Sequence, residues 1–159
     1  MQIHKFKYLI IIFAILFSFL IVVQTDIKLK KTENDDLYKW IRENTQENAI
    51  FIIPPTMEDF RLRANRAVIV DWKAFPFKDS AIIEWRDRIN DITNNKQNFK
   101  RYRGFNTYSQ LNNDYLSLNN SYILYLKEKY NAEYLVMMKE KQLNFTEIFN
   151  NSQFKLYHI

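Results

Sequence analysis

The chain has 159 residues, a formal net charge of +5, no cysteine and one glycine, Gly104. These counts exclude disulfides, thiolate chemistry and glycine-rich phosphate loops, and the two histidines, His4 and His158, do not have metal-ligand spacing. Residues 1–31 hold five lysines against one aspartate, a net charge of +4, and the remainder holds 18 basic and 17 acidic residues, a net of +1. Because a nucleic-acid-binding domain carries its basic excess on the folded part, we expect no nucleic-acid partner.

The N-terminal region contains an uninterrupted apolar run at 8–23, YLIIIFAILFSFLIVV. As a helix this run spans roughly 24 Å, and with two further residues at the interface it predicts a transmembrane helix over 8–25. A cleaved signal peptide is the alternative, since Lys5 and Lys7 form a basic n-region, but no small-x-small cleavage site follows. Lysines flank the run on both sides, so charge alone leaves the membrane orientation open.

Hydrophobic periodicity and turn residues predict seven elements beyond this region. In chain order they are a helix over 35–44, strands at 49–53 and 67–70, helices at 79–93 and 114–130, and strands at 133–138 and 154–159. We expect a long polar connection at 94–113 and a helical turn at 146–149. The order predicts an α/β fold with a small three- to four-stranded mixed sheet flanked by helices. Its first three strands would be parallel, with an antiparallel edge at the C-terminus.

The expected division of the chain has four parts: a basic flank at 1–7, the transmembrane helix at 8–25, a juxtamembrane spacer at 26–34 and a soluble α/β domain at 35–159. We therefore expect a single-pass protein of the cell membrane, in contact with the lipid bilayer.

Four motifs carry a resemblance to a known family: WIRENT, AIFIIPP, FRLRANRAVIVDWKAFPF and EWRDRI, at 40–45, 49–55, 60–77 and 84–89. On these motifs the chain resembles the C-terminal soluble domain of an uncharacterised family of bacterial integral membrane proteins. Its tail, EYLVMM followed by FKLYHI, is similar to the ends of multi-pass glycosyltransferases that use lipid-linked sugars. The resemblance implies an extracytoplasmic domain on a membrane anchor. Only one apolar helix precedes the domain, so we expect the active part of such a transferase to be absent. Because the function of the family is not established, the resemblance supplies no catalytic residues.

The candidate ligand-binding residues follow the two predicted strands at 49–53 and 67–70: Arg61, Arg66, Asp71, Lys73 and, on the next helix, Arg88. In an open α/β sheet a ligand binds outside the carboxyl ends of the strands, and paired guanidinium groups suit phosphate or carboxylate. The alternative is structural, with one of the first two arginines bound to the aspartate so that it ties the inter-strand connection down.

Two weaker candidates remain. Asp71 and Glu84 could form an acid/base pair of a small hydrolase, although Glu84 also has the i, i+4 spacing of an ordinary helix ion pair with Arg88. Trp85 fits the apolar stripe of the same helix better than a sugar platform. The segment 96–108 interleaves basic and aromatic residues, a pattern that binds lipid headgroups or sugars and is equally typical of a solvated loop.

We therefore expect a binding or accessory domain that is non-catalytic by itself, without metal or cofactor. Its expected partner is an anionic sugar, a lipid-linked glycan or a polytopic membrane protein. The alternative is a remnant or separate subunit of a lipid-linked-sugar glycosyltransferase.

Overall fold

The computed structural model describes residues 12–13, 17, 32–94, 102 and 104–159. The chain divides into two compact units, residues 1–32 and 33–159. In the first unit, Ile12, Phe13 and Phe17 are helical, and the rings of the two phenylalanines stack with their centroids 6.2 Å apart.

The structure contradicts the prediction of a transmembrane helix over 8–25 and of a single-pass membrane protein. Within the described residues, no helix has both the length and the apolar character that a bilayer crossing requires. The longest described helix has 14 residues, about 21 Å against a hydrocarbon core of about 30 Å. Except for Ile12, Phe13 and Phe17, the segment 8–25 lies outside the described residues.

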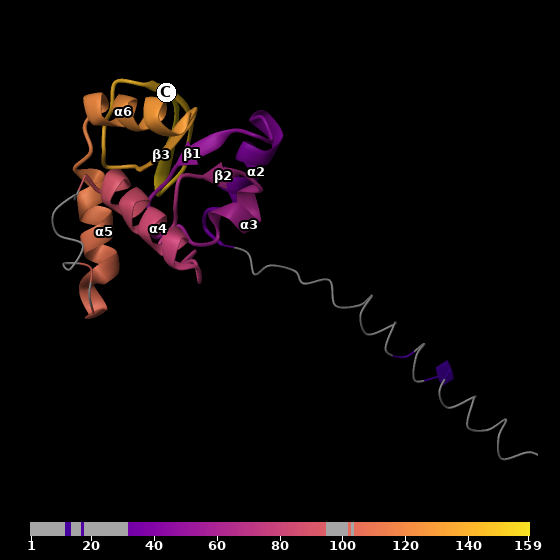
Figure 1. Cartoon of the computed structure of the whole chain (residues 1–159). Coiled ribbons are helices and arrows are strands. Elements are labelled where there is room, and N and C mark those ends of the chain that lie inside the picture. The colour runs from indigo at the N-terminus through magenta and orange to yellow at the C-terminus, as the bar shows by residue number, and fades with distance from the viewer. Residues whose placement is uncertain (1–11, 14–16, 18–31, 95–101, 103) are drawn as a thin grey trace, which may run out of the picture. The chain divides into compact units, whose positions relative to one another are not determined.

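The second unit is an α/β domain (Figure 1). Its elements in chain order are α2 (Asp35–Asn44), β1 (Ile50–Ile52), α3 (Phe60–Ala64), β2 (Ala67–Val68), α4 (Asp79–Ile92), the 3-10 helix η2 (Gly104–Asn106), α5 (Thr107–Leu116), α6 (Asn120–Tyr130), β3 (Tyr134–Met138), β4 (Thr146–Asn150) and β5 (Phe154–His158). The predicted helices at 35–44 and 79–93 and all four predicted strands are present, which confirms the α/β class.

The sheet has five strands in the order β2-β1-β3-β5-β4, not the three or four that were predicted. β1 pairs in parallel with β2 and β3, and β3 pairs antiparallel with β5, as expected. The additional strand is β4, where we expected a helical turn. A register shift between Glu147 and Phe149 interrupts its pairing with β5, which obscures the alternation that marks a strand in a sequence.

Two helices replace the single one predicted over 114–130. α5 begins within the expected polar connection, at Thr107, and α6 begins after Asn119. The Asn119 side chain accepts a hydrogen bond of 2.9 Å from the backbone N–H of Tyr122 and so caps α6. The short helix α3 was not predicted. It ends at Asn65, whose φ of 52° is left-handed.

Helices cover both faces of the sheet, so the domain has three layers (Figure 1). Successive residues of each strand point to opposite faces. Phe51 and Val136 therefore pack with α2 and α3, whereas Ile52 and Leu135 pack with α4, α5 and α6. β2 is an edge strand of two residues, and Arg61 of α3 and Arg88 of α4, from the two helical layers, line one pocket beyond its carboxyl end. Four of the five candidate residues, Arg61, Asp71, Lys73 and Arg88, lie around this end of the strand.

Candidate functional site

Two neighbouring pockets lie at the carboxyl end of β2 and share the side chain of Trp85. The first, called here the arginine pocket, has a volume of about 240 Å³ and is lined by Arg61, Ile69, Val70, Pro76, Ala81, Glu84, Trp85 and Arg88. The second, the aromatic pocket, has a volume of about 470 Å³ and is lined by Trp72, Lys73, Phe75, Trp85 and Tyr108. The position agrees with the rule that open α/β sheets bind ligands beyond their strand ends.

Arg61 and Arg88 reach the arginine pocket from opposite layers of the domain, α3 and α4. The Arg88 Nη1 donates a hydrogen bond of 2.9 Å to the backbone oxygen of Ile69, directly after β2, and so fixes α4 against the strand. Its Nη2 lies 2.5 Å from Oε1 of Glu84, one helical turn earlier. The structure thus brings two of the five predicted residues together in one cavity.

Asp71 lies behind this pocket and is 4% exposed. Its Oδ2 lies 3.2 Å from Nε of Arg61, and its Oδ1 accepts a hydrogen bond of 2.7 Å from the backbone N–H of Ala74. The carboxylate therefore orients Arg61 and closes the turn after β2. Arg61 does tie the inter-strand connection down, as the structural alternative proposed, yet its side chain stays half exposed.

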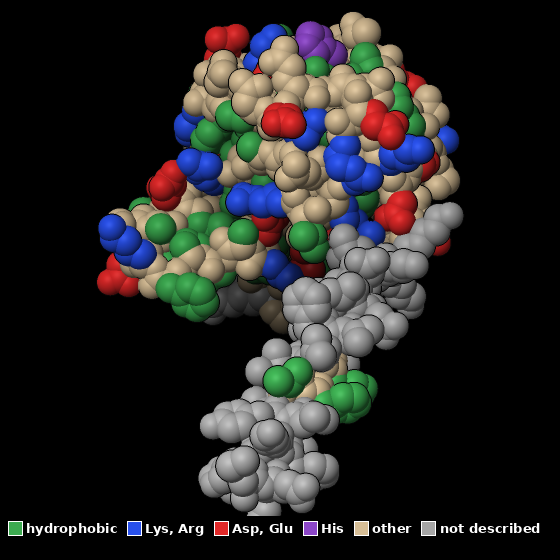
Figure 2. Space-filling model, turned by 90° about the vertical axis from the view of Figure 1, so that its right-hand side faces the viewer, with side chains coloured by type: hydrophobic (Ala, Val, Ile, Leu, Met, Phe, Trp, Pro, Cys, Tyr) green, Lys and Arg blue, Asp and Glu red, His purple; other side chains and the backbone are tan. Residues whose placement is uncertain are grey.

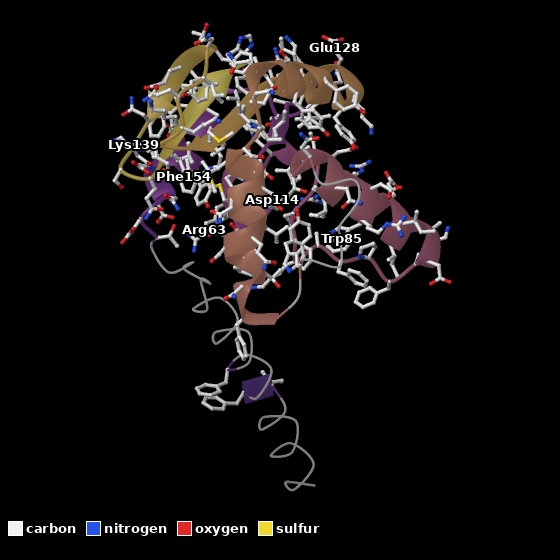
Figure 3. The ribbon with its side chains drawn as sticks, turned by 90° about the vertical axis from the view of Figure 1, so that its left-hand side faces the viewer. Arg63, Trp85, Asp114, Glu128, Lys139 and Phe154 are labelled. Atoms are coloured by element: carbon white, nitrogen blue, oxygen red, sulfur yellow. The ribbon has the colours of Figure 1, made fainter. Side chains whose placement is uncertain are left out.

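The aromatic pocket is built from rings that hold one another in place. Trp72 packs against Trp85 with ring centroids 5.2 Å apart and meets the edge of Tyr102 at 6.1 Å. Phe75 packs edge-on against Trp85 at 5.0 Å and remains 50% exposed. Figure 3 shows Trp85 on α4, near the part of α5 that carries Asp114. Mutual packing of this kind gives rigid aromatic surfaces beside solvent.

Three charged or polar groups tie the rim of the aromatic pocket together. Glu58, from the loop after β1, accepts a hydrogen bond from the hydroxyl of Tyr108 on α5 and forms an ion pair with Lys73. The hydrogen bond to Glu58, followed by its negative charge, raises the pKa of Lys73. The same hydrogen bond raises the pKa of the Tyr108 hydroxyl. Both groups therefore stay protonated at neutral pH. The Lys73 ammonium keeps further N–H donors for a ligand, whereas the Tyr108 hydroxyl gives its one proton to Glu58 and can only accept a hydrogen bond from a ligand.

Arg66 does not belong to either pocket. It is 6% exposed, and its guanidinium donates to the backbone oxygens of Arg42 and Thr45 at 3.0 and 2.8 Å. Its Nε donates to Oγ1 of Thr45 at 3.0 Å. These acceptors belong to the C-terminal end of α2, where carbonyl oxygens lack partners within the helix. The predicted role of Arg66 in ligand binding therefore has no support in this geometry.

The predicted acid/base pair of Asp71 and Glu84 receives little support. Glu84 lines the arginine pocket, whereas the Asp71 carboxylate is buried and forms an ion pair with Arg61. The two carboxylates therefore do not form an open acid/base pair. Within the described residues, no three His, Asp or Glu side chains are grouped to hold a metal ion. In the segment 96–108, residues 96–101 and 103 lie outside the described residues. Trp72, Phe75 and Tyr108 were not singled out as ligand residues, although the dense aromatics of the DWKAFPF motif were a usable signal.

Taken together, the open sheet and the two pockets define an α/β domain with candidate binding sites at its strand ends. Residues 33–92 match the family described as Domain of unknown function (DUF6798). The match covers less than half of the chain and includes α2, β1, α3, β2 and α4. Comparisons with curated proteins and with solved structures gave no match. The resemblance to integral membrane proteins and to glycosyltransferases stays a prediction.

Proposed function

We propose that the domain is a binding module, non-catalytic by itself, that holds an anionic sugar in the aromatic pocket. The single observation that carries this proposal is a pocket of about 470 Å³ lined by four aromatic side chains and one lysine. Its size is within the range of small-molecule sites, about 300–1,000 Å³. Such sites are mainly apolar and use a few polar groups to fix the orientation of the ligand.

The chemistry of the lining supports a sugar with a negative charge. A sugar ring presents C–H groups on its faces, which pack on the flat aromatic surfaces, and hydroxyls at its edge. Tyr108 is half exposed, and its phenolic oxygen, whose proton bonds to Glu58, can accept a hydrogen bond from a sugar hydroxyl. The ammonium of Lys73, on a side chain 66% exposed, supplies the positive charge for a carboxylate or phosphate. The sugar end of a lipid-linked glycan has the same chemistry.

Two observations support a non-catalytic role. The buried carboxylate of Asp71 is already bound to Arg61 and to a backbone N–H. It is therefore not available as a general base for a ligand in the aromatic pocket. Glu58 is held by Lys73 and Tyr108 at the rim. Both carboxylates therefore act on the protein itself. The groups left for a ligand are the remaining N–H donors of Lys73, the Tyr108 oxygen and the ring faces.

The proposal is tested by saturation-transfer NMR with glucuronic acid as the probe and glucose as its neutral counterpart. We expect transfer to glucuronic acid in the unmodified chain and a weaker signal for glucose. Phe75→Ala should weaken saturation transfer because it removes a ring face from the pocket. Lys73→Gln should abolish the preference for glucuronic acid over glucose.

Phe77→Ala is the matched control, because Phe77 is fully exposed, lies two residues from Phe75 and lines neither pocket. Equal losses of saturation transfer in Phe75→Ala and Phe77→Ala would show that the sugar adheres non-specifically to exposed aromatic side chains, and would contradict the proposal. No transfer to either sugar in the unmodified chain would contradict it as well.

A further inference from the structure

We propose that the arginine pocket is a separate binding site for an oxyanion, a phosphate or carboxylate group, with Arg61 as the principal donor and Glu84 as a competing carboxylate. This inference does not depend on a sugar in the aromatic pocket. It rests on what the guanidinium and carboxylate groups of the arginine pocket contact.

Arg61 is held in place but still has donors to offer. Its Nε lies 3.2 Å from the Asp71 carboxylate, which is itself buried and fixed by the Ala74 N–H. Among the described residues, the two terminal nitrogens of Arg61 have no hydrogen-bond partner, and the side chain is 50% exposed. A guanidinium anchored through Nε and open at both Nη atoms presents the planar fork that binds phosphate or carboxylate in a bidentate manner.

Arg88 supplies the second positive charge and is also pre-positioned. Its Nη1 bonds to the Ile69 oxygen, and its guanidinium carbon lies 5.7 Å from the ring centroid of Tyr130. Two fixed contacts on the protein side lower the entropy lost when a ligand binds. Glu84, 61% exposed and 2.5 Å from Arg88, accepts from one Nη2 donor of Arg88 when no anion is present. Since Glu84 is the more exposed member of the pair, an incoming anion can replace it.

The remaining lining favours a small anionic group over a larger ligand. The pocket holds about 240 Å³, and five of its eight lining residues are apolar: Ile69, Val70, Pro76, Ala81 and Trp85. Apolar walls lower the local dielectric and strengthen the attraction between a guanidinium and an anion. The lining carries two positive charges against one negative charge, and Asp71 behind it balances Arg61. The preference for an anion therefore comes from the open N–H donors of the two guanidinium groups and not from a net charge. In the view of Figure 2, the lobe at the lower left exposes hydrophobic side chains beside Lys and Arg side chains.

The test titrates the full chain with inorganic phosphate and, separately, with acetate, and follows the Nε–Hε resonances of the arginines by NMR. We expect the resonances of Arg61 and Arg88 to shift together along one binding curve, and that of Arg86 to stay in place. Phosphate and acetate distinguish a doubly charged from a singly charged oxyanion as the better ligand.

Two pairs of variants separate a site from general electrostatics. Arg61→Gln should weaken phosphate binding about tenfold, as expected for one lost charged hydrogen bond. Glu84→Gln should strengthen it, because the competing carboxylate is gone. The controls Arg86→Gln and Asp87→Asn make the same charge changes on exposed positions of α4 that lie outside the pocket. Circular dichroism of each variant checks that the fold is kept.

The proposal is overturned if Arg61→Gln weakens phosphate binding no more than Arg86→Gln, or if Glu84→Gln strengthens it no more than Asp87→Asn. It is equally overturned if no arginine resonance shifts in the unmodified chain. Arg61→Lys gives an independent check, since it keeps the charge but loses the fork, and should bind phosphate more weakly than the unmodified chain.

Discussion

The indole Nε1 of Trp85 donates a hydrogen bond of 3.0 Å to the backbone oxygen of Asp71. This contact joins α4 to the turn after β2 and fixes the ring that both pockets share. Trp85 is only 8% exposed, so its N–H needs a partner inside the protein. The sequence placed this tryptophan in the apolar stripe of its helix, and the structure shows that the same ring also forms a wall of both cavities.

We expect Trp85→Phe to lower the free energy of unfolding by about 1–3 kcal/mol, because it leaves the Asp71 oxygen unpaired and a space beside Phe75. Sugar and phosphate binding should both weaken, since the shared wall becomes mobile. Urea unfolding and the two NMR titrations measure these effects. Exposed Leu62→Ala, on α3, is a control that should leave stability and both titrations unchanged. If Trp85→Phe weakened neither titration, Trp85 would not be a wall that the two sites need.

Arg66→Met is expected to lower the free energy of unfolding by about 2–3 kcal/mol, because three acceptors near the end of α2 lose a charged donor. Phosphate binding should not change, since Arg66 lines neither pocket. Urea unfolding and the phosphate titration give the two readouts. A stable Arg66→Met variant with lost phosphate binding would reverse this assignment and return Arg66 to the ligand site.

Glu58→Gln tests the rim of the aromatic pocket. The hydrogen bond to Glu58 and its negative charge raise the pKa of Lys73, so removing the charge should lower that pKa toward its ordinary value. The pKa of Tyr108, raised by its hydrogen bond to Glu58, should fall as well. NMR titration of the lysine side chain and of the tyrosine ring measures both. Unchanged pKa values in Glu58→Gln would mean that the three groups are not associated in solution.

The stability of the domain should decrease in alkaline solution. Tyr115 is fully buried and donates a hydrogen bond of 2.6 Å to the backbone oxygen of Val136. Burial raises its pKa well above the ordinary value. Because the folded-state pKa is the higher one, the stabilisation is complete below the unfolded value of about 10 and is lost as the pH rises above it. Urea unfolding at increasing pH should show this decrease.

Tyr115→Phe distinguishes this residue from other sources of alkaline sensitivity. The variant loses one buried hydrogen bond, at a cost of about 1 kcal/mol at neutral pH. It also loses the group that ionises on unfolding, so its stability should depend less steeply on pH above about 10. An equally steep dependence in Tyr115→Phe would assign the effect to other tyrosines, such as Tyr122, whose pKa is raised to about 12 by burial.

Much of the fold was predictable because local patterns were strong. Leu37 and Ile41, one turn apart, marked α2, and the apolar run ending at Pro54 marked β1. The segments that failed depend on tertiary contacts. β4 is stabilised by pairing with β5 and by Phe149, which packs against Trp40 at 5.6 Å. α3 has only five residues, too few for a periodic pattern to emerge.

The candidate site was predictable only in part. Sequence order placed Arg61, Asp71 and Lys73 near one sheet edge, because they follow adjacent strands. It could not tell that Arg66 turns toward the end of α2, since that depends on the direction of a single side chain. The aromatics of the DWKAFPF motif signalled part of the aromatic pocket, but the contribution of Tyr108 could not be predicted because it comes from a helix that was predicted as a loop.

The boundary of the DUF6798 match has a consequence for how the domain folds. The match ends at residue 92, yet β1 pairs on its second edge with β3, through Phe51 with Tyr134 and Ile52 with Leu135. A fragment of residues 33–92 would expose that edge and the face of β1 that carries Ile52. We expect it to aggregate or stay unfolded, whereas 33–159 should fold cooperatively. The segment by which relatives are recognised is thus shorter than the segment that must be synthesised before the sheet can close.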